Sequence, residues 1–379
     1  MILIFVFVFC AICTCVAEGM NKQQRDTLFI FCLFILACVS GFRNMGGNDF
    51  LVYENIYSYI PTMPDVFNTS KDDFNYEYGY VLWVSLFKTL GFSYYGYILI
   101  NSFIFYVCLW YGLKRYTSNF GVLILIFLYK LFFYNTFISM RQSVTVAGFF
   151  LIAQYIEQRK LIPYFIGCYV LSRFHNGAYL LFLLYGLAYV NLTKRKIIFL
   201  NLLFIPTIFI GFAGIDVLGP IGKFLESQAD TTAELHRVDK YFNNENLSPI
   251  GIFHTLEYFL LMYFFVINYD KISKLNCFSS LAAKLFICLL PLFTLFRGSE
   301  ILTREKDYFT IFYAVILCYL MQIDKGKWRY FVLVSTMLLC AFGYYRYIVL
   351  FDGGVFLNYK PWFMNPDLHI FTSTSRCFY

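Results

Sequence analysis

Apolar runs recur along the whole chain, separated by short polar connections and by three longer polar segments. Several of these runs approach the roughly 20 residues that an α-helix needs to cross a bilayer. The pattern predicts an all-α polytopic integral membrane protein with about twelve transmembrane helices. The expected spans are Ile2 to Val16, Leu28 to Gly41, Phe92 to Gly112, Phe120 to Tyr134, Ser143 to Ile156, Leu161 to Leu171, Gly177 to Leu192, Ile197 to Phe212, Ile252 to Ile267, Phe278 to Phe296, Phe309 to Ile323 and Tyr330 to Tyr347.

Basic residues gather in alternate connections between these spans. Lysine and arginine are enriched on the cytoplasmic side of membrane proteins, so these connections are expected to face inward. The alternation then places both termini outside, together with the polar segments 42–91, 214–251, 297–308 and 351–379. The inward-facing basic residues are Lys22, Arg25, Lys114, Arg115, Arg159, Lys160, Lys194, Arg195, Lys196, Lys271, Lys274, Lys325, Lys327 and Arg329.

The composition agrees with a membrane protein. Of the 379 residues, 60% are hydrophobic and only 14% are charged, a balance that excludes an ordinary soluble domain. In a soluble protein the net charge of +7 would suggest an acidic partner, but here it is divided between the two sides of a membrane. We therefore expect a single membrane-embedded domain over residues 1–379, with the lipid bilayer as a partner and no nucleic acid.

A set of cationic side chains lies at the predicted outer ends of spans, where the positive-inside rule makes cations scarce. A lone arginine such as Arg173 can extend to the membrane interface at little cost. A set of them points instead to an outer ligand with negative charge. Guanidinium groups grip phosphate through paired hydrogen bonds, so a phosphate is the expected ligand. The set consists of Arg141, His175, Arg297 and Arg304.

Carboxylates and tyrosines occur on the same predicted face. Asp49 precedes a helical pattern that includes Tyr53, and Glu77 and Tyr80 belong to a segment that we expect to form an outer amphipathic or re-entrant helix. Gln142 follows the first of the outer arginines directly. Singly, each feature fits a solvated loop, an N-capping aspartate or an interfacial aromatic belt. Together they suit a ligand that carries both phosphate and sugar.

These motifs give the chain a resemblance to a known family, the EpsG-type polysaccharide polymerases, which are relatives of the Wzy O-antigen and capsule polymerases. The resemblance runs over nearly the whole chain. Two positions depart from the family pattern, because Gly177 and Ala178 stand where a Ser-Ala pair is usual and Thr145 stands where Ala is favoured. The matching residues are Gly47, Asp49 and Tyr53, Glu77, Gly79 and Tyr80, Arg141 and Gln142, Phe174 and His175, and Arg304 and Tyr308.

The resemblance implies a GT-C-like architecture in a bacterial inner membrane, with glycosyl transfer on the periplasmic face. The implied substrates are undecaprenyl-diphosphate-linked oligosaccharides, which are joined into O-antigen, capsule or exopolysaccharide. No cofactor or metal is required by this scheme. It leaves open which sugars are joined and whether a chain-length regulator binds.

The expected reaction needs cations for the diphosphate leaving group and a base for the acceptor hydroxyl. Arg141 and Arg304 are the expected diphosphate ligands, with Arg297 in reserve. For the base, the sequence leaves three candidates open, and for sugar contact it also offers three. The base candidates are Asp49, Glu77 and His175, and the sugar candidates are Tyr53, Tyr80 and Gln142.

Other functions share part of this pattern. An O-antigen ligase, or another polyprenyl-dependent glycosyltransferase, would show the same one-sided distribution of charge. A polysaccharide transporter or flippase would need ionisable groups near the middle of the membrane. Only Lys130 and Lys284 are plausible charges near the middle of a predicted span, which makes transport the less favoured alternative.

Overall fold

The computed structural model describes residues 1–44, 46, 49–69, 74, 76–213, 215, 220, 252–294, 304–323 and 326–364. The chain is all-α apart from one two-stranded sheet within these residues. It divides into two compact units. Unit 1 comprises Met1–Tyr155, Lys160–Leu183 and Leu333–Tyr379, and unit 2 comprises Ile156–Arg159 and Leu184–Val332.

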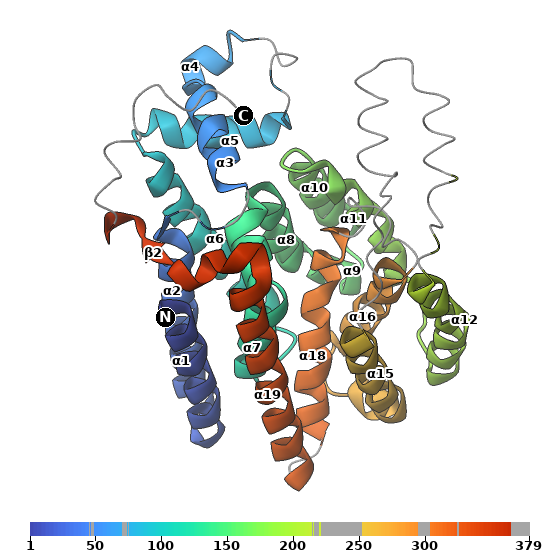
Figure 1. Ribbon diagram of the computed structural model, residues 1–379. Coiled ribbons are helices and arrows are strands. Elements are labelled where there is room, and N and C mark those ends of the chain that lie inside the picture. The colour runs from blue at the N-terminus through green and yellow to red at the C-terminus, as the bar shows by residue number, and fades with distance from the viewer. Residues whose placement is uncertain are drawn as a thin grey trace. The chain divides into compact units, whose positions relative to one another are not determined.

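Unit 1 contains the N-terminal helices and the C-terminal end of the chain (Figure 1). Its α-helices are α1 (Ile2–Val16), α2 (Lys22–Gly41), α3 (Phe50–Tyr59), α4 (Met63–Val66), α5 (Tyr78–Thr89), α6 (Tyr94–Leu113), α7 (Phe120–Lys130), α8 (Met140–Ile152), α10 (Leu161–Ser172), α11 (Leu180–Leu183) and most of α19 (Lys327–Leu350). Its shorter elements are η1 (Ala17–Gly19), the π-helix η3 (Tyr134–Ile138), η4 (Asn176–Tyr179), η7 (Phe351–Asn358) and η8 (Trp362–Met364).

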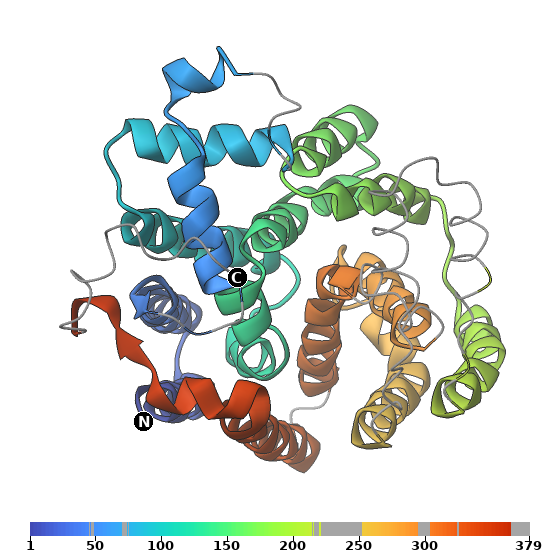
Figure 2. The same cartoon turned by 45° about the horizontal axis from the view of Figure 1, so that its top comes forward.

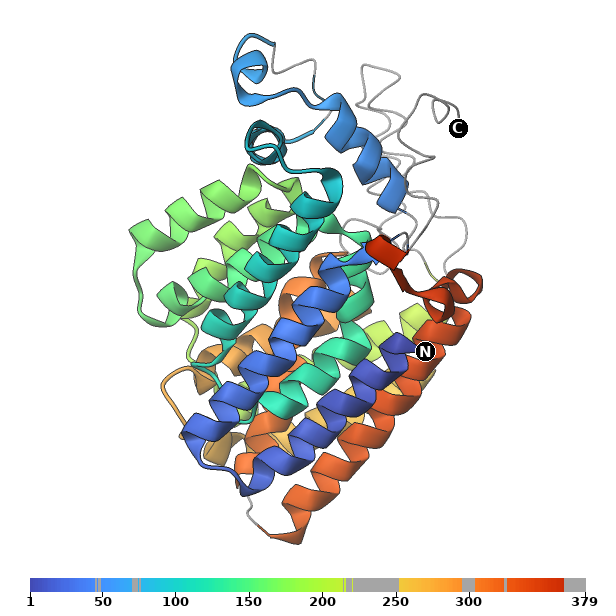
Figure 3. The same cartoon turned by 90° about the vertical axis from the view of Figure 1, so that its left-hand side faces the viewer.

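The long helices of unit 1 pack in a chain of neighbours, in which α1 contacts α2 and α7, α2 contacts α6, α6 contacts α8, and α8 contacts α10 (Figure 3). Small residues allow this close packing. A Cβ atom added to Gly112 of α6 would lie 2.6 Å from the Cβ of Phe150 in α8, so only glycine fits there. Because packing in lipid relies on such close contacts, glycine at this point fixes the α6–α8 pair.

Helices α3, α4 and α5 gather at one end of unit 1, beyond the ends of α6 and α8 (Figures 1 and 2). Side chains of α5 hold the connection between α3 and α4. Ser85 donates to the Pro61 carbonyl at 2.7 Å, and the Thr89 hydroxyl accepts from the Met63 N–H at 2.8 Å. Lys88 donates to the last carbonyls of α3. These bonds satisfy backbone groups that a helix end would otherwise leave open.

The two strands β1 (Arg43–Asn44) and β2 (Lys360–Pro361) pair antiparallel and attach the end of the chain to the end of α2. The Trp362 N–H also donates to the Phe42 carbonyl at 2.8 Å. Arg43 is buried at this junction, where it donates to the Ser40 carbonyl at 2.7 Å and lies 5.4 Å from the Phe137 ring centroid. Burial lowers the pKa of Arg43 to about 10, so the group stays charged at neutral pH.

Unit 2 consists of apolar helices. Helix α18 packs on α15 and α16, and α12 packs on α15 and α16. Within this unit Lys284 donates from Nζ to the Leu187 carbonyl at 2.8 Å, so the charge of this lysine satisfies the end of a short helix. The elements are η5 (Leu184–Ala188), α12 (Lys194–Phe212), α15 (Ile252–Ile272), α16 (Ser279–Phe293), α18 (Asp307–Ile323) and the start of α19.

The predicted all-α membrane-protein fold is confirmed at the level of its helices. Within the described residues, four helices are long and apolar enough to cross a membrane, namely Ile2–Gly19, Lys22–Gly41, Tyr94–Leu113 and Lys327–Leu350. The predicted spans that begin at Phe120, Leu161, Phe278 and Phe309 correspond to shorter apolar helices, and the predicted span from Gly177 to Leu192 is broken into η4, α11 and η5. The count of twelve spans and the GT-C-like architecture stay predictions.

The hydrogen bonds of Lys88 can be tested for their role in attaching α3 to α5. Its Nζ donates to the carbonyls of Tyr57 at 3.1 Å, Ser58 at 2.9 Å and Ile60 at 2.6 Å. Hydrogen bonds to charged groups are worth about 1.5 to 3 kcal/mol. Lys88→Met should therefore loosen α3, which is measured as faster proteolytic cleavage between α3 and α4 in lipid nanodiscs.

The matched control is Lys22→Met, since Lys22 is exposed at the start of α2. This variant should be cleaved at the wild-type rate. Equal cleavage of Lys88→Met and wild type would show that the lysine bonds do not hold α3.

Candidate functional site

Glu77 is the centre of a cluster that joins three separate segments of unit 1. It is the residue before α5, with an extended backbone, and its carbonyl accepts from the N–H groups of Tyr80 at 2.9 Å and Val81 at 3.1 Å. Its side chain is not used to cap its own helix. The carboxylate is only 10% exposed and is directed to partners from α8 and from the segment after α10.

Arg141 is the first partner. Its Nη1 donates to Glu77 Oε2 at 2.6 Å. The guanidinium carbon lies 5.4 Å from the ring centroid of Tyr76 and 5.9 Å from that of Tyr80. Arg141 is the second residue of α8, and the positive end of a helix dipole disfavours a cation there. The carboxylate and the aromatic faces therefore compensate a charge that the helix itself would repel.

The second partner is the turn that follows α10. The Asn176 N–H donates to Glu77 Oε1 at 3.0 Å, and His175 Nδ1 lies 3.7 Å from the same oxygen. The latter distance is too long for a good hydrogen bond and makes an electrostatic contact. The carboxylate thus has one oxygen for the arginine and one for the histidine turn.

These contacts determine the charge of the site. Burial alone would raise the pKa of Glu77, but the contact with His175, the charge of Arg141 and the backbone N–H of Asn176 outweigh it and lower the pKa to about 2. A carboxyl with a lowered pKa stabilises the folded state above its ordinary value, here 4.5. The stabilisation is complete at neutral pH and is lost as the pH falls from 4.5 towards 2.

Gly79 allows the start of α5 to touch the histidine turn. A Cβ atom at Gly79 would lie 2.6 Å from Arg173 Cβ and 2.7 Å from the Arg173 carbonyl oxygen, which is closer than atoms can approach. That carbonyl also accepts from the Tyr80 N–H at 3.2 Å. Glycine is therefore required for Glu77 to reach His175 and Asn176.

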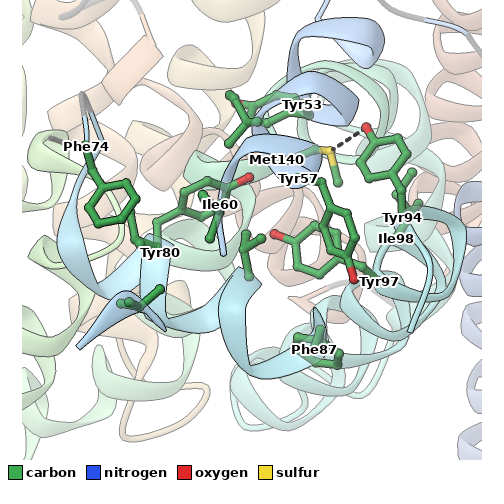
Figure 4. Close-up of a cluster of buried hydrophobic side chains, with 14 of the residues drawn as sticks. Tyr53, Tyr57, Ile60, Phe74, Tyr80, Phe87, Tyr94, Tyr97, Ile98 and Met140 are labelled. Atoms are coloured by element: carbon green, nitrogen blue, oxygen red, sulfur yellow. Dashed lines mark hydrogen bonds between the residues drawn. The ribbon is translucent and has the colours of Figure 1, made fainter. Parts of the chain in front are cut away.

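A core rich in tyrosines holds α3, α5 and the start of α6 together, and it includes Tyr80, which Arg141 contacts (Figure 4). The Tyr94 hydroxyl donates to the Phe50 carbonyl at 2.9 Å and contacts Met140 Sδ at 3.7 Å. The rings of Tyr53 and Tyr80 meet edge to face, with centroids 6.4 Å apart. Because Met140 precedes Arg141, this core also sets the position of the arginine.

The structure brings three predicted site residues together, namely Glu77, Arg141 and His175. Tyr53 also interacts electrostatically with the guanidinium of Arg141. The side chains expected to contact sugar are covered by protein, since Tyr80 is 1%, Gln142 3% and Tyr53 7% exposed. Tyr53 and Tyr80 instead interact with Arg141.

The other predicted site residues belong to other parts of the chain. Asp49 is half-buried before α3, and no ion pair or side-chain hydrogen bond joins it to the cluster within the described residues. Arg304 belongs to unit 2, beside Glu305. Burial and the neighbouring Asp307 raise the pKa of Glu305 to about 8, while the charge of Arg304 acts in the opposite direction. Arg297 and Gly47 lie outside the described residues.

Sequence reasoning missed two contributors to the site. Tyr76 gives an aromatic face to Arg141, whereas the sequence pattern places it only on the apolar stripe of the expected outer helix, with no role at the site. Asn176 contributes a backbone N–H, which no side-chain motif can reveal. Among the described residues, no three His, Cys, Asp or Glu side chains form a group that could hold a metal ion.

The geometry defines a class of protein. It is an all-α protein with membrane-type helices and a site built from an arginine, a glutamate and a histidine. The chain belongs to the EpsG family, whose model matches residues 26–361. This is a Wzy-like family related to polysaccharide polymerases. No curated protein and no solved structure matches the chain. The matched range includes all three cluster residues, and it confirms the resemblance drawn from the motifs.

The close approach at Gly79 gives a prediction that separates packing from helix propensity. In a helix, Gly→Ala normally adds up to about 1 kcal/mol of stability. Gly79→Ala should do the opposite, because the added methyl group pushes α5 away from the Arg173 backbone. We expect loss of the Glu77 contacts and of cellular function, measured by complementation of a deletion strain at equal membrane abundance.

Gly19→Ala is the control, since no atom lies within 4 Å of a Cβ at Gly19. It should complement as well as wild type. Full complementation by Gly79→Ala would show that α5 has room to move without harm to the site.

Proposed function

We propose that the protein is a polymerase that joins undecaprenyl-diphosphate-linked oligosaccharide repeat units by glycosyl transfer. The reaction would take place on the periplasmic face of a bacterial inner membrane, with both chain termini on that side. Membership of the EpsG family supports polymerisation as the class of activity. The observation that carries the proposal is the cluster in which Glu77 binds Arg141 and the His175 turn.

Arg141 suits a diphosphate leaving group. Only one of its nitrogens donates to Glu77, and its Nε is buried without a hydrogen bond within the described residues. A guanidinium has five N–H donors in a planar fork, so donors remain for phosphate oxygens. The ion pair with Glu77 fixes the plane of the fork in advance. A preorganised donor stabilises developing charge without the cost of reorganisation.

In the proposed step, a hydroxyl of the acceptor sugar attacks the anomeric carbon of the donor glycan. A new C–O bond forms while the bond from the anomeric carbon to the diphosphate oxygen breaks. The electron pair of the broken bond stays on the lipid diphosphate, where Arg141 compensates the charge. The acceptor hydroxyl loses its proton to a base.

Among the three candidates for the base, His175 fits best. Glu77 is a weak base because its pKa is about 2 and both of its oxygens are engaged. No ion pair or side-chain hydrogen bond joins Asp49 to the cluster within the described residues. Imidazole is the side chain most often used as a general base, and the Glu77 carboxylate, 3.7 Å from His175 Nδ1, would stabilise the imidazolium that forms. Glu77 thus serves as the electrostatic partner of the base.

The proposed function is tested by the surface polysaccharide of a deletion strain. Such a strain should carry single repeat units, and the wild-type gene should restore long polymers. His175→Ala and Glu77→Gln should reduce polymer length sharply at normal membrane abundance. Free polymer that accumulates on the lipid carrier of the deletion strain would instead identify a ligase, and wild-type polymer would exclude both activities.

The nature of the Arg141 contact has its own test. Lysine keeps the charge but offers neither the planar fork nor stacking on Tyr76 and Tyr80. Arg141→Lys should therefore fail nearly as badly as Arg141→Ala, with a loss of polymer of about 100-fold or more. The measurement is the length distribution of lipid-linked polysaccharide.

Purified protein distinguishes a ligand role from a structural role. Inorganic diphosphate should raise the unfolding temperature of wild type in detergent clearly more than that of Arg141→Lys. Full polymer from Arg141→Lys would show that a simple positive charge is sufficient. An Arg141→Lys protein that responds to diphosphate as strongly as wild type would place the phosphate contact elsewhere.

A further inference from the structure

Arg173 is an exposed cation that the proposed mechanism does not use. It follows α10 directly, and its guanidinium carbon lies 4.6 Å from the ring centroid of Tyr169. Its Nη2 also donates to the Tyr179 hydroxyl at 3.0 Å. Within the described residues it has no carboxylate partner. Two tyrosines therefore hold the fork in place while most of its donors stay available.

An apolar stripe leads along α10 to this arginine. Ile162, Ile166 and Val170 are separated by four residues each, so they share one face of the helix with Tyr169 and Arg173. All three aliphatic side chains are exposed, by 71%, 59% and 49%. The stripe begins beside Lys160, at the end predicted to face inward, and finishes at the end predicted to face outward.

The Arg173 backbone is also part of the catalytic cluster. Its carbonyl accepts from the Tyr80 N–H at 3.2 Å, and the next residues lead to His175 and Asn176. A ligand on the Arg173 side chain would therefore lie at the edge of the Glu77 site. The surface joins an apolar path, a cation that has no carboxylate partner among the described residues, and a proposed site for glycosyl transfer.

We propose that the Arg173 guanidinium and the stripe of Ile162, Ile166 and Val170 form the docking surface for a polyprenyl-type lipid diphosphate, which reaches the site sideways from the bilayer. The diphosphate binds the arginine and the isoprenoid chain lies along α10. Charge complementarity supports this occupant, since the stripe alone would suit any lipid chain but the cation at its outer end selects an anionic head. Phosphate also matches the planar fork.

This inference rests on the proposed function for its choice of a lipid-linked substrate, and its test measures binding without polymerisation. A benzophenone amino acid is placed at Ile166, and the protein in phosphatidylcholine nanodiscs is irradiated with radiolabelled undecaprenyl diphosphate. The control site is Phe342 of α19, which is also 59% exposed and lies at a similar distance from the end of its helix. We expect labelling at Ile166 at least tenfold above that at Phe342.

The arginine variants identify the contact. Arg173→Ala should reduce labelling at Ile166 about tenfold, and Arg173→Lys should restore it only in part, since an ammonium stacks poorly on Tyr169. Tyr179→Phe removes one bond to the guanidinium and should give an intermediate loss even if Arg173→Ala fails to insert. Unlabelled undecaprenyl diphosphate should compete, whereas phosphatidylglycerol should not.

Equal labelling at the two sites, no effect of the Arg173 and Tyr179 variants, or equal competition by phosphatidylglycerol would each overturn the docking surface. Failure of the docking surface and failure of the proposed function give different results. If wild type restores polymer in the deletion strain but labelling is independent of Arg173, the docking surface is wrong and the polymerase assignment stands. If labelling depends on Arg173 but no polymer is restored, the chain binds lipid diphosphates for another purpose.

Discussion

The ion pair between Glu77 and Arg141 is the interaction on which the rest of the site depends. Its atoms are 2.6 Å apart although the residues are 64 positions apart in sequence. Removal of one partner from a buried pair costs about 3 to 5 kcal/mol, because the other charge is left without compensation. Here Arg141 keeps 27% of its side chain exposed, which reduces that cost. Glu77 also binds the histidine turn, so the pair holds α5, α8 and the end of α10 in a single arrangement.

The tyrosine core explains how such an arrangement is maintained at a helix end. Polar contacts near water are individually weak, and a site on loops alone would lack precision. The rings of this core bury large apolar areas, and their hydroxyls satisfy backbone carbonyls such as that of Phe50. The core positions α3 and α5, and Gly79 lets α5 approach Arg173. With the backbone in place, only the side-chain conformation of Glu77 has to be fixed to complete the cluster.

Helices could be predicted from the sequence much better than the contacts between them. The apolar run from Ile2 to Val16 coincides with α1, since a continuous hydrophobic segment leaves few alternatives. Helix α8 begins at Met140, three residues before the predicted start, because the polar pair Arg141 and Gln142 interrupts the hydrophobic pattern but not the helix. The pairing of Glu77 with Arg141 could not be predicted by periodicity, which carries no information on which helix ends meet.

The position of Arg141 explains why a single carboxylate does not neutralise the positive potential of the site. The start of α8 already carries the positive end of a helix dipole, and a guanidinium adds a full positive charge to it. One carboxylate oxygen of Glu77 accepts from a single nitrogen of Arg141. The other oxygen contacts Asn176 and His175. Some N–H donors of Arg141 are therefore not bound by Glu77, and the positive potential at the start of α8 is only partly neutralised. In the proposed function a diphosphate would meet both requirements, because it offers several oxygens and more than one negative charge, and it would bind without displacing Glu77.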